Sequence, residues 1–133
     1  MSYILSVLTE VEAETDFPTK LKKVCKKHEL DPGEYCLSIA QHVEHAHPGK
    51  YHFYGVHDKE DTEQHKNLLY HVYMHDPKTN QFFDGSGEHT QKHLDKEWKG
   101  DNTISRVDPR KHEQLLGGKH VHINKAMIRD LRD

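Results

Sequence analysis

The spacing of apolar residues changes near Pro48, and this change constrains the fold more than any other feature of the chain. Before Pro48, apolar side chains recur every three or four residues, which is the pattern of amphipathic helices. After it, apolar and polar residues alternate, as they do in half-buried strands. This order predicts an α+β fold, in which a helical N-terminal half packs on a small antiparallel sheet. The 133 residues suit a single domain that spans residues 1–133.

Local start and stop signals give the expected extent of each element. Asp16 or Thr15 can cap a first long helix, and Asp31 is the expected N-cap of a second. We expect helices at residues 17–28, 32–47, 90–98, 109–116 and 126–131, and strands at residues 51–56, 68–75, 81–84 and 104–107. Residues 4–11 fit either a short helix or a strand. A Gly-Ser-Gly sequence is expected to end the strand at residues 81–84.

Residues 68–84 predict a β-hairpin, because two alternating runs flank Asp-Pro-Lys-Thr-Asn, a sequence with good turn chemistry. A four-residue loop at residues 77–80 pairs Met74 with Phe83 and keeps both in the core. We therefore prefer this register. His75, near the tip of the hairpin, is expected to face solvent.

The same register places His71 and Asp84 on one face of the sheet. Tyr73 is then opposite Asp84, and His71 is a diagonal neighbour, roughly 7–8 Å away at the backbone and within side-chain reach. A five-residue loop would instead put Asp84 opposite Val72, on the other face. A histidine whose ring a carboxylate can hold is half of a nucleophilic site.

The missing nucleophile can come from the helical half of the chain. Cys36 lies near the start of a helix that should pack on this sheet, and helix N-termini stabilise thiolates because their N–H groups favour negative charge. Cys25 falls on the packing face of the first long helix, so we interpret it as a core residue. Without a recognisable export signal, both cysteines are expected as free thiols in a reducing cytosol, which predicts a cytoplasmic protein.

The order of these residues resembles the papain-like superfamily, above all its small transglutaminase-like and NlpC/P60-like members, as in small phage or bacterial proteins. The matching segments are PGEYCLSIA at residues 32–40, YHVY at 70–73, FFDGSG at 82–87 and the following helix with Leu94 and Trp98. The resemblance covers residues 30–98 and implies a papain-like core. It implies Cys36 as the nucleophile, His71 as base and acid, and Asp84 as the group that orients His71. The backbone N–H of Cys36 would serve the oxyanion hole.

The resemblance implies a cysteine-dependent hydrolase or acyltransferase that acts on an amide or ester bond of a protein or peptide substrate, without a cofactor. The direction of the chemistry stays open, because proteases, deamidases, amidases and transglutaminases share these residues. A second class of function is a non-enzymatic small protein, encoded by a phage or mobile element, that binds and blocks a host protein. The reactivity of the Cys36 thiol distinguishes the two classes.

The chain contains 14 histidines, and some of them cluster in ways that could bind a metal ion. His42, His45 and His47 form one cluster, while His120 and His122 form another. A histidine-rich metal-binding module is therefore a further alternative. Catalytic zinc usually takes three protein ligands, however, and the H-E-x-x-H signature is absent. We therefore expect scattered surface histidines and no metal site.

Charge and hydropathy argue against two classes of partner. The formal net charge is −3, and the cationic residues form no basic footprint for nucleic acid. The apolar run at the start of the chain is too short to span a membrane. Neither a nucleic acid nor a membrane is therefore an expected partner.

Overall fold

The computed structural model of the chain describes residues 16–58, 69–100, 102–111 and 119–133. Within these ranges, the helices are α2 (Phe17–Lys27), α3 (Cys36–Ala46), α4 (Gln91–Leu94) and α5 (Lys125–Arg132), with a π-helical segment η1 (Asp95–Lys99) and a short 3-10 helix η2 (Pro109–Lys111). The strands are β1 (His52–Asp58), β2 (His71–Asp76), β3 (Gln81–Asp84), β4 (Gly87–His89) and β5 (Asn102–Arg106). The predicted α+β class is confirmed.

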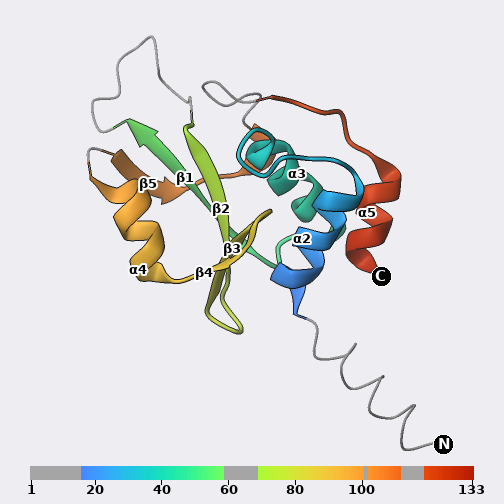
Figure 1. Cartoon of the computed structure of the whole chain (residues 1–133), viewed down its shortest axis with the longest axis horizontal. Coiled ribbons are helices and arrows are strands. Elements are labelled where there is room, and N and C mark those ends of the chain that lie inside the picture. The colour runs from blue at the N-terminus through green and yellow to red at the C-terminus, as the bar shows by residue number, and fades with distance from the viewer. Residues whose placement is uncertain (1–15, 59–68, 101, 112–118) are drawn as a thin grey trace, which may run out of the picture.

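The strands form one antiparallel sheet in the order β4-β3-β2-β1-β5. Helices α2, α3 and α5 lie on one face of the sheet, and α4 with η1 lies on the other (Figure 1). The main core fills the first interface, where fully buried side chains include Leu21, Leu37, Ile39, Leu69, Met74, Phe83, Met127 and Leu131. A smaller cluster joins Val56 and Tyr73 of the sheet to Leu94 of α4. The sheet thus has a helical layer on both faces.

The hairpin formed by β2 and β3 has the predicted register. Met74 pairs with Phe83, and Asp76 pairs with Gln81, so the loop between the strands contains residues 77–80. The Asp76 side chain accepts a hydrogen bond from a backbone N–H inside the loop at 2.8 Å. Asn80 ends the loop with a φ of 61°, which asparagine tolerates better than most residues. Turn chemistry and core packing therefore favour the same register.

The second long helix begins at Cys36 and not next to Asp31, so the predicted N-cap is wrong. Asp31 stabilises a separate turn, because its Oδ1 accepts hydrogen bonds from the N–H groups of Gly33 at 2.8 Å and Glu34 at 3.2 Å. Its carbonyl also accepts a hydrogen bond from the Tyr35 N–H. Because the chain completes this turn before the helix starts, Cys36 takes the first helical position, where backbone N–H groups have no partner within the helix.

Of the strand boundaries near the hairpin, the start of β2 differs from the prediction, and the end of β3 agrees with it. The chain bends at Tyr70, which turns Leu69 into the main core, so β2 starts only at His71. The Gly-Ser-Gly sequence ends β3 at Asp84, as predicted, but the sheet continues beyond it. Asp84 pairs with Gly87, whose φ of 115° glycine adopts at no steric cost, and the chain returns as β4.

The later helical predictions are partly correct. The helix predicted at residues 90–98 is α-helical to Leu94 and continues as π-helix. The helix predicted at residues 109–116 is a 3-10 turn in its first part, and its remainder lies outside the described residues. The segment predicted at residues 4–11 also lies outside them. Helix α5 agrees with the prediction to within one residue at each end.

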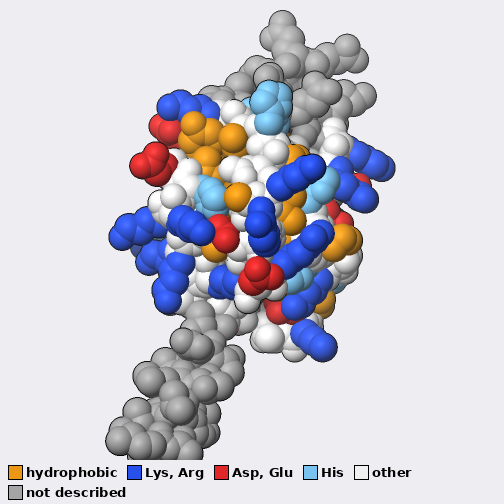
Figure 2. Space-filling view, turned by 90° about the vertical axis from the view of Figure 1, so that its right-hand side faces the viewer, with side chains coloured by type: hydrophobic (Ala, Val, Ile, Leu, Met, Phe, Trp, Pro, Cys, Tyr) orange, Lys and Arg blue, Asp and Glu red, His pale blue; other side chains and the backbone are white. Residues whose placement is uncertain are grey.

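The outer helices present a basic surface. Helix α2 begins as predicted, with Asp16 accepting a hydrogen bond from the Thr19 N–H at 3.0 Å. Lys and Arg side chains gather on the face that α2 and α5 form (Figure 2). The exposed ones are Lys22, Lys23, Lys26, Lys27, Lys125, Arg129 and Arg132. No helix in the described part of the chain has the length and apolar character needed to cross a membrane.

Gly55 on β1 lies where a larger residue would collide with the core. A Cβ atom at this position would meet Leu69 Cδ2 and Val107 Cγ1, each at 2.8 Å. We expect Gly55→Ala to lower the free energy of unfolding by about 1–3 kcal/mol, the usual cost of overpacking, as measured by urea unfolding. Ser105→Ala is the matched control, because Ser105 pairs with Gly55 and is exposed. Equal stability of the two variants would contradict the tight packing at Gly55.

Candidate active site

His71 and Asp84 lie on the same face of the β2–β3 hairpin, as the predicted register requires. His71 Nε2 lies 3.2 Å from Asp84 Oδ2, and both side chains are buried. Burial lowers the pKa of His71, but hydrogen bonds to Asp84 and Cys36 outweigh it and raise the pKa from 6.5 to about 9. The imidazole is therefore protonated at neutral pH and lies against a carboxylate.

Asp84 is held by several donors. Its Oδ1 accepts hydrogen bonds from the Ser86 N–H at 2.8 Å and from the Ser86 hydroxyl, and it lies 3.0 Å from His89 Nε2. Burial raises the pKa of Asp84, but hydrogen bonds from His71 and Ser86 outweigh this effect and hold the pKa well below its ordinary value. The turn that leads into β4 therefore keeps Asp84 oriented and charged.

Cys36 is the third group at this point of the structure. It is the first residue of α3 and is 1% exposed. Its thiol lies close enough to His71 to help raise the pKa of the imidazole. Helix α3 packs on β2, which brings the start of the helix to the start of the strand. The structure thus brings together all three predicted site residues, Cys36, His71 and Asp84.

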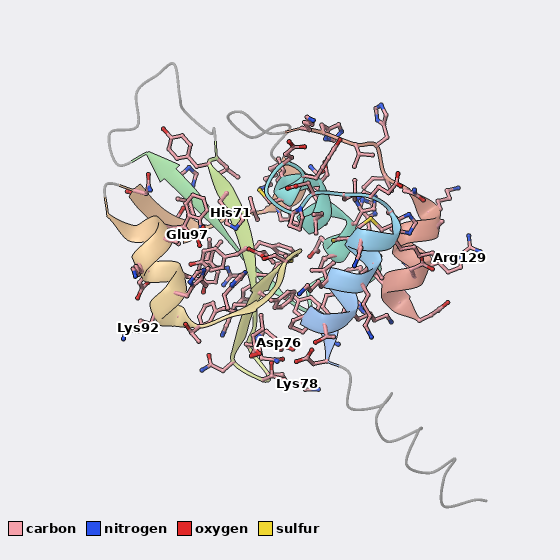
Figure 3. All side chains as sticks on the ribbon, viewed as in Figure 1. His71, Asp76, Lys78, Lys92, Glu97 and Arg129 are labelled. Atoms are coloured by element: carbon pink, nitrogen blue, oxygen red, sulfur yellow. The ribbon has the colours of Figure 1, made fainter. Side chains whose placement is uncertain are left out.

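A cleft of about 730 Å³ opens beside His71. One wall is the loop before α3, at Pro32 and Gly33, and the other wall is formed by α4 and η1. Figure 3 shows His71 on β2 close to Glu97, which also lines the cleft. The Cys36 side chain does not line the cleft, in agreement with its burial. A substrate in this cleft would therefore meet His71 first.

Sequence reasoning missed three residues of the cleft. Ser86 and His89 bind Asp84, and they could have been found from the Gly-Ser-Gly turn, since a chain that reverses directly after Asp84 returns beside its carboxylate. Trp98 is predicted only as an inward-facing helical residue. Its indole stacks on the His71 ring, with ring centroids 4.7 Å apart and an interplanar angle of 7°.

Ser86, His89 and Asp84 do not form a second catalytic triad. Ser86 Oγ lies 3.0 Å from His89 Nε2, but the same nitrogen faces Asp84. A base that activates a serine needs one ring nitrogen on the serine and the other on the acid. Ser86 and His89 therefore support Asp84 in its contact with His71.

Cys25 is a core residue, as predicted. It is 1% exposed. Burial, and to a lesser extent the charge of Asp84, raise the pKa of its thiol to about 12. Cys25 therefore stays protonated at neutral pH, and it provides an internal reference for the reactivity of Cys36.

The prediction of surface histidines is wrong for His42 and only partly correct for His75. His42 is fully buried, with Nδ1 2.7 Å from the Ser38 carbonyl oxygen and Nε2 accepting the Asn124 N–H at 2.9 Å. It therefore ties α3 to the segment before α5. His75 is half-buried against Phe82, with ring centroids 4.4 Å apart, so it faces solvent only in part. Among the described residues, no group of three or more His, Cys, Asp or Glu side chains is placed to hold a metal ion.

Neither protein-family models, nor curated proteins, nor solved structures show a match to this chain. The functional interpretation therefore rests on the geometry around His71. A buried carboxylate, an imidazolium and a thiol at a helix N-terminus are the groups that nucleophilic acyl transfer uses.

The raised pKa of His71 predicts a pH-dependent contribution to stability. A group whose pKa is higher in the folded state stabilises the fold fully below its unfolded pKa, here 6.5, and this contribution is lost as pH rises through about 9. We expect the free energy of unfolding of the wild type to fall more steeply across this range than that of His71→Gln, as measured by urea unfolding. His45→Gln is the matched control, because His45 is exposed. Parallel curves for wild type and His71→Gln would contradict the ion pair.

Proposed function

We propose that the protein is a cysteine-dependent hydrolase or acyltransferase that acts on an amide or ester bond through Cys36, His71 and Asp84. One observation carries the proposal: a single buried imidazole is hydrogen-bonded to a carboxylate and lies beside a thiol that begins a helix. The resemblance to the papain-like superfamily supports it, because the same residue types follow one another there in the same order.

His71 first activates the thiol. Asp84 binds Nε2 of the imidazole, which leaves Nδ1 for Cys36. In the protonated form of His71, Nδ1 carries the proton that the Cys36 thiol has released. The resulting imidazolium stabilises the thiolate, and the unpaired N–H groups at the start of α3 add to this stabilisation. Asp84 stays ionised and keeps the ring in its orientation.

The thiolate of Cys36 then attacks the carbonyl carbon of the substrate, which forms a carbon–sulfur bond and puts a negative charge on the carbonyl oxygen. The backbone N–H of Cys36, at the start of the helix, stabilises this oxyanion. His71 donates its proton to the leaving amine or alcohol as the bond to the carbonyl carbon breaks. Water or a second amine, deprotonated by His71, attacks the thioester, releases the acyl group and restores the thiolate.

The substrate class that fits the cleft is a protein or peptide. A cleft of about 730 Å³ has room for several side-chain-sized groups, and its lining combines the aromatic residues Tyr70 and Trp98 with polar ones. Both cysteines are free thiols, which suits a reducing cytoplasm. A thiolate nucleophile is oxidised less readily in such a compartment.

A second candidate function is non-enzymatic: binding and blocking a partner protein. The burial of Cys36 favours it, because the side chain is 1% exposed and belongs to the main core. A buried free cysteine is most often an inert, small hydrophobic residue. In the enzymatic proposal, substrate binding has to open a path to this thiol past His71.

Acylation by p-nitrophenyl acetate tests the proposal, because attack by Cys36 releases nitrophenolate and leaves an acetyl group on the sulfur. We expect a rapid release of about one nitrophenolate per chain from the wild type and from Cys25→Ala, and none from Cys36→Ser. His71→Gln and Asp84→Asn should slow the release by about a hundredfold or more, since they remove the base or its orienting group.

Two results of this experiment would overturn the enzymatic proposal. The first is a folded wild-type protein that releases no nitrophenolate, and the second is a full release from Cys36→Ser. Mass spectrometry of the acetylated chain locates the acetyl group, which excludes acylation of a surface lysine.

A further inference from the structure

Trp98 is the sole tryptophan of the chain, and its indole lies over His71. The ring centroids are 4.7 Å apart and the planes differ by 7°, so the two rings stack almost parallel. The rings come from facing elements of the cleft, His71 from β2 and Trp98 from η1. His71 is only 6% exposed, and the indole is one of the groups that shield it from water.

The backbone around Trp98 is built to hold the indole in place. The π-helical turn of η1 follows Leu94, which is buried in the smaller cluster against Val56 and Tyr73. Asn102 of β5 donates a hydrogen bond from Nδ2 to the Trp98 carbonyl oxygen at 2.9 Å. Turns of π-helix are rare and often occur at functional sites. The π-helical turn that carries Trp98 is thus held at its start by the packing of Leu94 and at its end by the hydrogen bond from Asn102.

We propose that Trp98 is a positioning residue of the site, which stacks its indole on His71 and holds the imidazole in the protonated form. A cation on the face of an indole is attracted by the quadrupole of the ring, and the attraction grows where water is excluded. The stacking of the two rings is seen in the geometry itself and does not depend on any chemistry at Cys36. Its consequence for Cys36, a more stable thiolate, rests on the proposed function.

Charged and titratable groups from several elements lie around His71. They are Cys36 from α3, Asp84 from β3, His89 from β4, and His93, Lys96 and Glu97 from α4 and η1. Asp84 and Cys36 favour the imidazolium, whereas the positive charge of Lys96 opposes it. His93 is paired with Glu97 at 2.9 Å. Substitution of Trp98 removes the stack and leaves these charges in place.

NMR titration of the His71 imidazole in Trp98→Leu and Trp98→Phe tests the proposal. We expect Trp98→Leu to weaken the affinity of His71 for its proton about tenfold, and Trp98→Phe to keep most of the wild-type affinity because it restores a stacking face. Phe82→Leu is the matched control, since Phe82 packs on the same face of the sheet against Tyr73 and His75. An unchanged His71 titration in Trp98→Leu would overturn the proposal. A loss of packing alone would instead lower the free energy of unfolding of both Trp98→Leu and Phe82→Leu.

The fluorescence emission of Trp98 provides a second test, which needs no substitution of the tryptophan. An imidazolium quenches a stacked indole more strongly than a neutral imidazole does. We expect the emission of the wild type to rise as His71 loses its proton, and His71→Gln to lack this rise. The same pH curve in both proteins would overturn the proposal, even if Trp98→Leu fails to fold.

Neither reading depends on chemistry at Cys36, so the two proposals fail separately. If the titrations behave as expected but p-nitrophenyl acetate releases no nitrophenolate, the proposed function fails and the role of Trp98 stands. If the ester reacts but Trp98→Leu leaves the His71 titration unchanged, the role of Trp98 alone fails.

Discussion

The hydrogen bond between His71 Nε2 and Asp84 Oδ2 is the contact on which the rest of the site depends. A buried ion pair is favourable only when further hydrogen bonds satisfy its remaining atoms. Asp84 obtains them from Ser86 and His89, and the Cys36 thiol beside His71 also favours the imidazolium. Without the charge of Asp84, burial would favour the neutral imidazole, and the thiol would lose the cation that can stabilise its ionised form.

Three local features of the chain position the groups of this site. The loop at residues 77–80 fixes which side chains of β2 and β3 share a face, and a slip of one residue would turn Asp84 away from His71. The turn at Asp31 delays α3, so that the helix starts at Cys36. Gly85 lets the next turn approach the helices closely, because a Cβ there would lie 3.0 Å from Ile39 Cδ1.

The sequence predicts the parts of this arrangement that short-range chemistry determines. Alternation and turn residues agree on one hairpin register, so the meeting of His71 with Asp84 could be worked out before the fold was known. The N-cap role of Asp16 could also be predicted, because its carboxylate accepts a hydrogen bond from the nearby Thr19 N–H of the same chain segment.

The features that sequence reasoning missed depend on contacts between distant segments. Asp31 suits a turn as well as a helix start, and only the packing of α3 on β2 shows which one it forms. The glycines after Asp84 could end a strand or reverse it, and the pairing of β4 with β3 decides between the two. Helical spacing places Trp98 on an inward face but does not show that the ring beneath it is His71.

The central claim is that His71 makes Cys36 reactive within the folded protein. The rate of alkylation by iodoacetamide at pH 6, with each adduct located by mass spectrometry, tests it most directly. An ordinary thiol, with a pKa of about 8.5, is almost wholly protonated at that pH and reacts slowly. We expect Cys36 to react much faster than Cys25, and His71→Ala to abolish the difference. Equally slow labelling of both cysteines in the native protein, or labelling of Cys36 that persists without His71, would contradict the claim.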